Sequence, residues 1–162
     1  MTAADLGAAH ALSRRVHPNY PEDEAVLAEK LSLFAPGCFI LEAASGIGGY
    51  CFSHPWTTAE PPDLNRRLGR LPPSPSSYFI HDLTLAEDQR RGGAARDLVE
   101  RLFVVARQLG LARLSLVSVN DTRAFWHRMG FMVTADSDLQ GAVRRKYGDG
   151  AVAMERAIGP LP

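Results

Sequence analysis

Residues 81–96 read HDLTLAEDQRRGGAAR, and the interpretation of the whole chain starts from this stretch. Its first residues complete an apolar run from Tyr78 to Leu85 that predicts a β-strand. A turn with two adjacent glycines follows. Residues 93–109 then carry apolar side chains at the spacing of an amphipathic helix. The pattern predicts a strand, a tight turn and the first turn of a helix.

The turn at residues 89–94 has features of a phosphate site. The first amides of a helix have no partner within it, and the helix dipole adds partial positive charge at the same point. Phosphate groups bind at such N-termini. Gly92 and the small Ala94 let a pyrophosphate approach the backbone closely. Three arginines add positive charge nearby: Arg90, Arg91 and Arg96. The same turn could also be a purely structural connection.

Two common nucleotide-binding motifs do not fit this turn. A Walker A loop needs Gly-x-x-x-x-Gly-Lys-Ser/Thr, and no lysine follows the glycines here. The dinucleotide fingerprint needs Gly-x-Gly-x-x-Gly, whereas these glycines are adjacent. The turn therefore predicts neither a P-loop nor a Rossmann site.

The flanking segments predict an α/β (α+β) layout in which helices cover a mixed sheet. We expect helices at residues 3–16, 22–34, 93–109 and 120–129, and strands at 38–41, 47–53, 78–85, 114–119, 131–134 and 152–156. The proline-rich residues 54–77 predict a long loop. Its three arginines either lie on a solvated surface or belong to a flap over a substrate site: Arg66, Arg67 and Arg70.

Bulk composition narrows the class of protein. The 162 residues suffice for one domain, and 18 basic residues balance 18 acidic ones. This balance argues against general binding of nucleic acid or of a membrane surface. No apolar run approaches the ~20 residues of a membrane span, and no signal peptide is evident, so a cytoplasmic location is expected. Cys38 and Cys51 are expected to be reduced core residues, and no metal site is expected.

The resemblance to a known family becomes specific at two motifs. Residues 89–94, QRRGGA, resemble the Gln/Arg-x-x-Gly-x-Gly/Ala signature of the GNAT superfamily of N-acetyltransferases. Asp82 to Leu85 looks like the end of that family's fourth strand. Asn120, followed by FWHRMGF at residues 125–131, resembles its later Asn…Tyr-x-x-x-Gly-Phe segment. The resemblance spans roughly residues 3–157. It implies a single GNAT-like domain over residues 1–162, with a mostly antiparallel sheet whose fourth and fifth strands splay apart.

The resemblance implies acetyl-CoA as cosubstrate, without a metal. The pantetheine arm would lie between the splayed strands and pair with the backbone of Leu83 and Leu85, and Asn120 would lie beside it. The pyrophosphate would contact amides of the glycine turn. The residues implied in coenzyme binding are Leu83, Leu85, Gln89, Arg90, Arg91, Gly92, Gly93, Ala94, Ala95, Asn120 and Trp126.

The implied reaction is direct attack of a neutral amine on the thioester in a ternary complex. The amide of Leu85 would hold the carbonyl oxygen, a role worth ~3 kcal/mol in the transition state. His81 and Asp82 are the candidate bases, because a base near the fourth strand is the usual solution. Strand alternation predicts that only one of them faces the acceptor. Either residue could instead brace the strand.

Two departures from the family pattern leave questions open. Trp126 stands where the family has a tyrosine that protonates the departing thiolate, and indole is no proton donor at neutral pH. Substitutes are water or one of three side chains: His127, Ser118 and Tyr147. No strand is predicted before the first helix, and the edge exposed by its absence could support a homodimer.

The acceptor is not identified by the sequence. The first two helices and the 54–77 loop would shape its pocket, with polar and aromatic residues to offer: His17, Tyr20, Glu22, Asp23, Glu24, His54 and Trp56. A small-molecule amine and a peptide amine remain open. The alternatives to an amine acetyltransferase are a non-catalytic acyl-CoA-binding or sensor module, and an acyltransferase with another donor or acceptor.

Overall fold

A six-stranded sheet runs through the computed structural model, which describes residues 1–44 and 46–159. The strand order is β1-β2-β3-β4-β6-β5, and every neighbouring pair is antiparallel except β3 and β4. The strands are β1 (Cys38–Ala43), β2 (Gly46–Trp56), β3 (Ser77–Leu85), β4 (Arg113–Ser118), β5 (Met132–Val133) and β6 (Val152–Ala157). The helices are α1 (Leu6–Val16), α2 (Glu24–Leu33), α3 (Ala94–Gln108), α4 (Arg123–Arg128) and α5 (Ser137–Tyr147), with 3-10 turns η1 (Ala3–Asp5), η2 (Ala35–Gly37) and η3 (Glu87–Gln89). The mixed, mostly antiparallel sheet expected from the sequence is confirmed.

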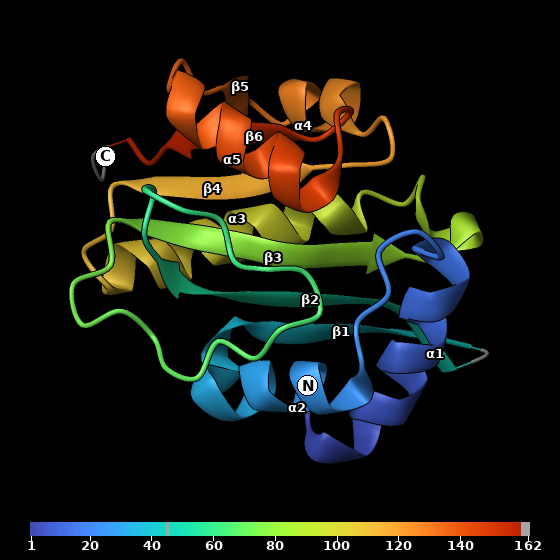
Figure 1. Cartoon of the computed structure of the whole chain (residues 1–162). Helices are drawn as coiled ribbons and strands as arrows, with labels where there is room; N and C mark the ends of the chain where they lie inside the picture. The colour runs from blue at the N-terminus through green and yellow to red at the C-terminus, as the bar shows by residue number, and fades with distance from the viewer. Residues whose placement is uncertain (45, 160–162) are drawn as a thin grey trace.

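Helices cover both faces of this sheet (Figure 1). α1 and α2 pack against β1 and β2 on one face, where Leu12 and Leu27 join Phe52 in a buried cluster. α3 and α4 lie on the other face, where Leu102 and Trp126 belong to the main core. α5 covers β6 on the side of α1 and α2. Each helix therefore contributes one apolar stripe to a shared interior.

β3 and β4 separate soon after they meet. They pair in parallel only at three positions, from Tyr78 with Leu114 to Ile80 with Leu116. β3 continues to Leu85 without further pairing to β4, while β2 accompanies it along its other edge as far as Leu85. The expected splay is thus confirmed, and it leaves one edge of β3 unpaired over residues 82–85.

The chain crosses the α1–α2 side of the sheet between β2 and β3 (Figure 1). This loop, residues 57–76, is shorter than the predicted 54–77 because His54, Pro55 and Trp56 belong to β2. Its contacts with α5 include those of Lys146 Nζ with the Glu60 and Asp63 carboxylates, at 2.7 and 2.8 Å. The loop is therefore held against a helix that lies on the same face of the sheet, over β6.

α5 is the one helix that the sequence reasoning did not predict. Asp136 caps it, because its carboxylate accepts the amides of Asp138 and Leu139. Gly148 follows its end. Within residues 1–44 and 46–159, no strand precedes α1, which agrees with the departure noted from the family pattern. The N-terminal segment instead forms η1, where Thr2 donates to the Asp5 carboxylate.

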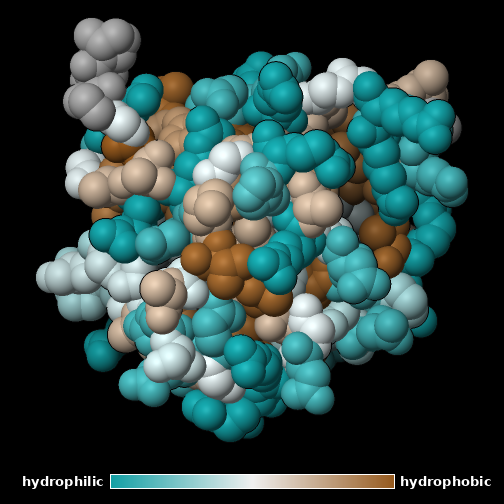
Figure 2. Space-filling view, turned by 90° about the horizontal axis from the view of Figure 1, so that it is seen from above, coloured by the Kyte–Doolittle hydropathy of each residue, from teal (hydrophilic) through white to brown (hydrophobic). Residues whose placement is uncertain are grey.

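The surface seen from above is mostly hydrophilic, with hydrophobic surface restricted to patches (Figure 2). Met132 and Val133 of the short strand β5 are among the exposed apolar residues. In the part of the chain that the structure describes, no helix combines the length and hydrophobicity needed to cross a membrane.

Candidate active site

The free edge of β3 presents two backbone amides to an open groove. The Ala86 amide donates to the Gly48 carbonyl of β2, at 2.8 Å. Antiparallel pairing alternates, so the polar groups of Leu83 and Leu85 point away from β2 and toward β4. The Arg90 guanidinium donates to the Leu85 carbonyl at 3.2 Å, which agrees with a carbonyl that points away from β2. Leu83 and Leu85 line the groove together with Asn120, Phe125 and other side chains of the α4 region.

The glycine turn leaves a row of amides without acceptors. Among the described residues, no carbonyl or side chain accepts the amides of residues 91–95, which lead into α3. Gly93 has φ +81°, a conformation that favours glycine, and a Cβ there would meet nothing within 4 Å. Gly92 is similarly open, with its nearest atom 3.9 Å from an added Cβ. These amides lie at the positive end of a 15-residue helix.

Arginines line two hollows near this turn. Arg90 and Arg128 line the groove that begins at Leu83. Arg96 and Arg128 line a neighbouring hollow with Arg156. Gln89, by contrast, turns its amide nitrogen to the Asp88 carboxylate, 3.1 Å away. The turn and the arginines together form a site suited to a diphosphate.

A second cavity lies on the α1–α2 side of the same strand. It is lined by His17, Tyr20, Glu22, Leu64, Phe79, His81, Asp82, Val117, Val119 and Tyr147. Three of the residues expected to shape an acceptor pocket therefore contribute: His17, Tyr20 and Glu22. Asp23, Glu24, His54 and Trp56 do not line it. Leu64 is the contribution of the 57–76 loop, whereas Arg66, Arg67 and Arg70 are exposed to solvent.

A β-bulge explains why His81 and Asp82 line the same cavity. Phe52 of β2 pairs with Asp82, but the next residue, Ser53, pairs with Ile80. His81 is therefore an extra residue on β3, and a bulge redirects side chains from simple alternation. The expectation that the two side chains face opposite ways overlooked this bulge, because nothing in the sequence of β3 indicates it. Both residues also line the wedge between β3 and β4.

His81 belongs to a buried ionic cluster. Its Nε2 lies 3.2 Å from Oε1 of Glu22, and the Lys30 ammonium lies 3.1 Å from the same oxygen. Only 5% of the His81 side chain is exposed, and its Nδ1 has no partner among the described residues. Burial raises the pKa of Glu22, but the charges and hydrogen bonds of His81 and Lys30 outweigh this effect and lower the pKa to about 2. The carboxylate is therefore ionised in the neutral range.

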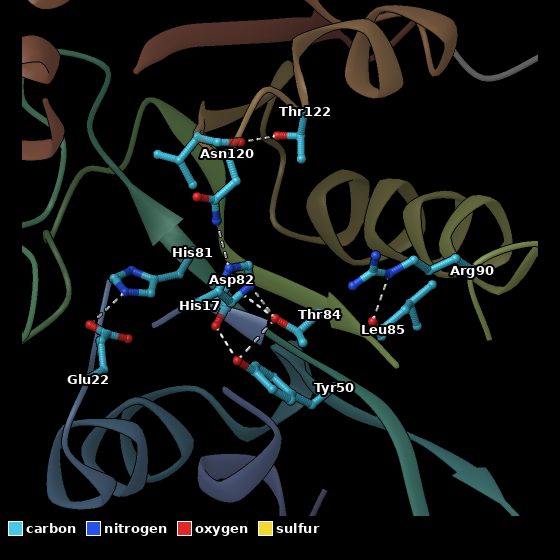
Figure 3. Close-up of polar contacts among 11 residues, drawn as sticks. His17, Glu22, Tyr50, His81, Asp82, Thr84, Leu85, Arg90, Asn120 and Thr122 are labelled. Atoms are coloured by element: carbon cyan, nitrogen blue, oxygen red, sulfur yellow. Dashed lines mark hydrogen bonds and ion pairs between the residues drawn. The ribbon is translucent and has the colours of Figure 1, made fainter. Parts of the chain in front are cut away.

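Asp82 is held by a different set of partners (Figure 3). The hydroxyls of Tyr50 and Thr84 donate to its carboxylate, at 2.5 and 2.9 Å. Burial, and then the charge of Asp82, raise the pKa of Tyr50 above its ordinary value, so this hydroxyl stays protonated. The His17 ring reaches Thr84 Oγ1 at 2.7 Å and Asp82 Oδ1 at 3.5 Å. Asp82 thus anchors a network that spans α1, β2 and β3.

Asn120 lies where the sequence placed it, at the end of β4. Asn120 and Asp121 both have positive φ, +52° and +57°, which turns the backbone sharply toward α4. The Asn120 side chain then meets the His17 ring, with Nδ2 3.0 Å from Nδ1 (Figure 3). Trp126 is 7% exposed and packs edge-on against Phe125 and Phe131. It lines the wedge but belongs mainly to the core.

The three other candidate proton donors have different surroundings. His127 is exposed on α4. Ser118 is buried, and its hydroxyl pairs with Thr122 Oγ1 at 3.1 Å. Tyr147 lines the acceptor-side cavity, where its hydroxyl donates to the Pro62 carbonyl at 2.6 Å. Burial raises the pKa of Tyr147 above its ordinary value.

Sequence reasoning missed the contributions of Tyr50, Thr84 and Lys30. Tyr50 and Thr84 occupy paired positions on neighbouring strands, which no local motif reveals. Lys30 lies four residues after Val26 and three after Leu27, so its burial could have been suspected from its place on that apolar face of α2. No three His, Cys, Asp or Glu side chains in residues 1–44 and 46–159 are grouped as a metal site requires.

Comparison with solved structures identifies the fold. The GphF GNAT-like decarboxylase in complex with isobutyryl-CoA has 19% identity and a TM-score of 0.76, over 98% of this chain and 97% of that one. N-acetylglutamate synthase from Neisseria gonorrhoeae, complexed with coenzyme A and N-acetyl-glutamate, has 19% identity and a TM-score of 0.73, over 98% of this chain and 34% of that one. The ribosomal-protein-S18-alanine N-acetyltransferase from Escherichia coli has 17% identity and a TM-score of 0.63, over 100% and 93%.

Sequence comparison gives the family. No curated protein matches the chain. The family model described as Acetyltransferase (GNAT) family matches residues 8–131, which include β3, the glycine turn and the end of β4. The chain therefore belongs to the GNAT family of acetyltransferases.

Proposed function

We propose that this protein transfers an acetyl group from acetyl-CoA to a primary amine. The observation that carries the proposal is the continuity of two features: the unpaired edge of β3 at Leu83 and Leu85, and the five free amides of residues 91–95. An extended arm ending in a diphosphate matches both, since it can pair with the first and bind the second. Membership of the GNAT family and the acyl-CoA or CoA bound to two similar structures support this ligand.

The chain's own residues suggest how the reactants would meet. The arm would pair with Leu83 and Leu85, the diphosphate would contact the turn from Arg91 to Ala95, and Arg90 and Arg128 would add charge. Asn120 would lie beside the arm. The amide of Leu85 would donate to the thioester oxygen as negative charge develops there. The acceptor amine would enter from the cavity of His17, Tyr20 and Tyr147, on the other side of β3.

The acceptor is proposed to be a small-molecule or peptide amine. Two of the similar structures represent these classes: one contains N-acetyl-glutamate, and the other is named for acetylation of a ribosomal-protein alanine. The balanced charge of 18 basic and 18 acidic residues argues against general binding of nucleic acid or of a membrane surface.

A CoA-binding module without turnover is the second candidate function. Trp126 favours it, because a buried indole within the core replaces a hydroxyl that could protonate the departing thiolate. The two functions differ in one measurement: thiol release from acetyl-CoA in the presence of a panel of primary amines and short peptides. Transfer predicts release that depends on the amine, with an acetylated product seen by mass spectrometry. Tight binding of acetyl-CoA without release with any amine would support the module.

Another acyl donor is tested in the same assay. One similar structure is a decarboxylase in complex with a branched acyl-CoA, so the panel should include isobutyryl-CoA beside acetyl-CoA. Faster thiol release from isobutyryl-CoA than from acetyl-CoA would mean that the protein transfers the branched acyl group instead of acetyl.

A further inference from the structure

Among the described residues, His17 is the one side chain that lines three separate hollows beside β3. It borders the acceptor-side cavity, the groove along Leu83 and Leu85, and the wedge between β3 and β4. The residue follows α1, whose last turn ends at Val16, and Pro18 prevents the helix from continuing through it. The imidazole is thereby placed between the proposed amine and the proposed thioester.

The hydrogen bonds around His17 agree with only one neutral form of the ring. The Asn120 Nδ2 is a donor, so the Nδ1 atom 3.0 Å away must carry the lone pair. Nε2 then carries the hydrogen and donates to Thr84 Oγ1, at 2.7 Å. The Thr84 hydroxyl in turn donates a hydrogen bond to Asp82, and the Tyr50 hydroxyl donates to the same carboxylate. Every hydrogen in the network is accounted for, and the chain of donors ends at a negative charge.

The groups around the ring favour its protonation. Burial lowers the pKa of His17 and Arg90 also lowers it, but the hydrogen bond and charge of Asp82 raise it, and the net value lies above its ordinary 6.5. The other titratable side chains around the cavity are Glu22 and Tyr20 after α1, His81 on β3 and Tyr147 on α5. Glu22 and His81 are engaged with each other and with Lys30, so Asp82 is the carboxylate that His17 faces directly.

We propose that Nδ1 of His17 accepts the proton from the acceptor amine, and that Asp82, through Thr84, positions the ring and stabilises its charged form. The proposal rests on the proposed transfer function. The Asn120 amide first releases Nδ1. The ammonium of the acceptor then gives one proton to this nitrogen, and the ring passes the proton to solvent. The nitrogen lone pair then forms the C–N bond as the C–S bond breaks. The nitrogen's second proton leaves with that step and goes to the sulfur, so the products are an amide, a thiol and one released proton.

The experiment compares His17→Gln with two histidine controls. His10→Gln removes a histidine from α1, the helix that precedes His17; His10 pairs with Glu24 outside the three hollows. His81→Gln removes the other imidazole of the cavity. With acetyl-CoA and the best amine of the panel, His17→Gln should lower kcat at least 10²-fold. Its affinity for acetyl-CoA, measured by calorimetry, should stay within threefold of the wild type. A loss in His81→Gln that equals or exceeds the loss in His17→Gln would overturn the assignment.

The pH profile tests the role of Asp82. In the wild type, kcat/KM should rise with pH as His17 loses its proton, and Asp82→Asn should move this rise to lower pH because it removes the charge that holds the proton. A structural role alone would reduce activity without moving the profile. Wild-type activity with an unmoved profile would overturn the role of Asp82 while leaving the transferase function intact.

A measurement without turnover separates failure of this inference from failure of the function. Histidine nitrogen shifts of the free protein, assigned by their loss in His17→Gln, report which ring nitrogen carries the hydrogen above the pKa. The hydrogen is expected on Nε2, and Asp82→Asn should lower the titration midpoint of this ring. A hydrogen on Nδ1 would overturn the proposal whatever the enzyme assay shows. Absence of thiol release with every amine would overturn the transferase function and, with it, this role of His17.

Discussion

Replacing Glu22 with glutamine tests the buried ionic cluster below the acceptor-side cavity. The variant keeps the shape of the side chain but leaves the Lys30 ammonium, only 1% exposed, without its negative partner. The pKa of Glu22 falls from 4.5 to about 2 in the folded protein. At ~1.4 kcal/mol per pKa unit, the ionised carboxylate contributes up to ~3 kcal/mol at neutral pH. Breaking a buried pair by removing one partner costs a similar ~3–5 kcal/mol.

The dependence on pH follows from the direction of the change. A carboxyl whose folded pKa is lowered stabilises the protein fully above its unfolded value, here 4.5, and the contribution disappears as pH falls through about 2. The difference between wild type and Glu22→Gln should therefore be largest at pH 6–7. It should shrink steadily as the pH falls below about 4.5.

Urea denaturation at several pH values, followed by the fluorescence of the two tryptophans, measures this difference. The matched control is Glu24→Gln in the first turn of α2, two residues after Glu22; its side chain is 53% exposed and its histidine partner is 3.7 Å away. This control should change stability by less than ~0.5 kcal/mol. A double variant, Glu22→Gln with Lys30→Met, should recover part of the loss because the unpaired ammonium is gone. Equal effects of Glu22→Gln and Glu24→Gln at pH 7 would refute the reasoning.

Three further changes test the coenzyme site, the core and the loop. Gly92→Asp should weaken acetyl-CoA binding at least tenfold, or ~1.4 kcal/mol, by placing negative charge beside the free amides. The variant should fold, because an added Cβ has its nearest neighbour 3.9 Å away. Calorimetry measures the affinity, and an unchanged value would refute the site. Leu102→Ala should cost ~2–5 kcal/mol in urea, because this side chain is fully buried in the main core. Tyr147→Phe removes the bond to Pro62, and should raise KM for the amine while leaving acetyl-CoA affinity unchanged; a change in coenzyme affinity instead would contradict the cavity assignment.

Local patterns in the sequence were sufficient to predict much of the fold. The strand predicted from Tyr78 to Leu85 differs from β3 only at its start, because β3 begins one residue earlier, at Ser77. The helix after the glycine turn and its left-handed end at Gly110, with φ +69°, are also as expected. These features depend on residues close in sequence, so spacing and turn chemistry carry them. α5 was not predicted because its sequence, SDLQGAVRRKY, has few apolar positions and one glycine.

Long-range contacts in the site could not be predicted in the same way. The bulge at His81 arises from the register of β2 against β3, and the partners of Asp82 come from three separate elements. The role of Thr84 depends on a histidine 67 residues away in the chain. Such contacts have no local signature, whereas the coenzyme motif does, because its function resides in consecutive backbone amides.

The brief pairing of β3 with β4 makes this seam a weak junction between the two halves of the sheet. Three register pairs join the half built from β1 to β3 with the half built from β4 to β6. Amides beside the seam should exchange with solvent sooner than those inside either half. A thioester carrier bound along the seam would contact both halves, and at a concentration of a hundred times its Kd it would add ~2.7 kcal/mol to the free energy of unfolding. The resistance of the protein to heat and proteases would then follow the supply of its own acyl donor.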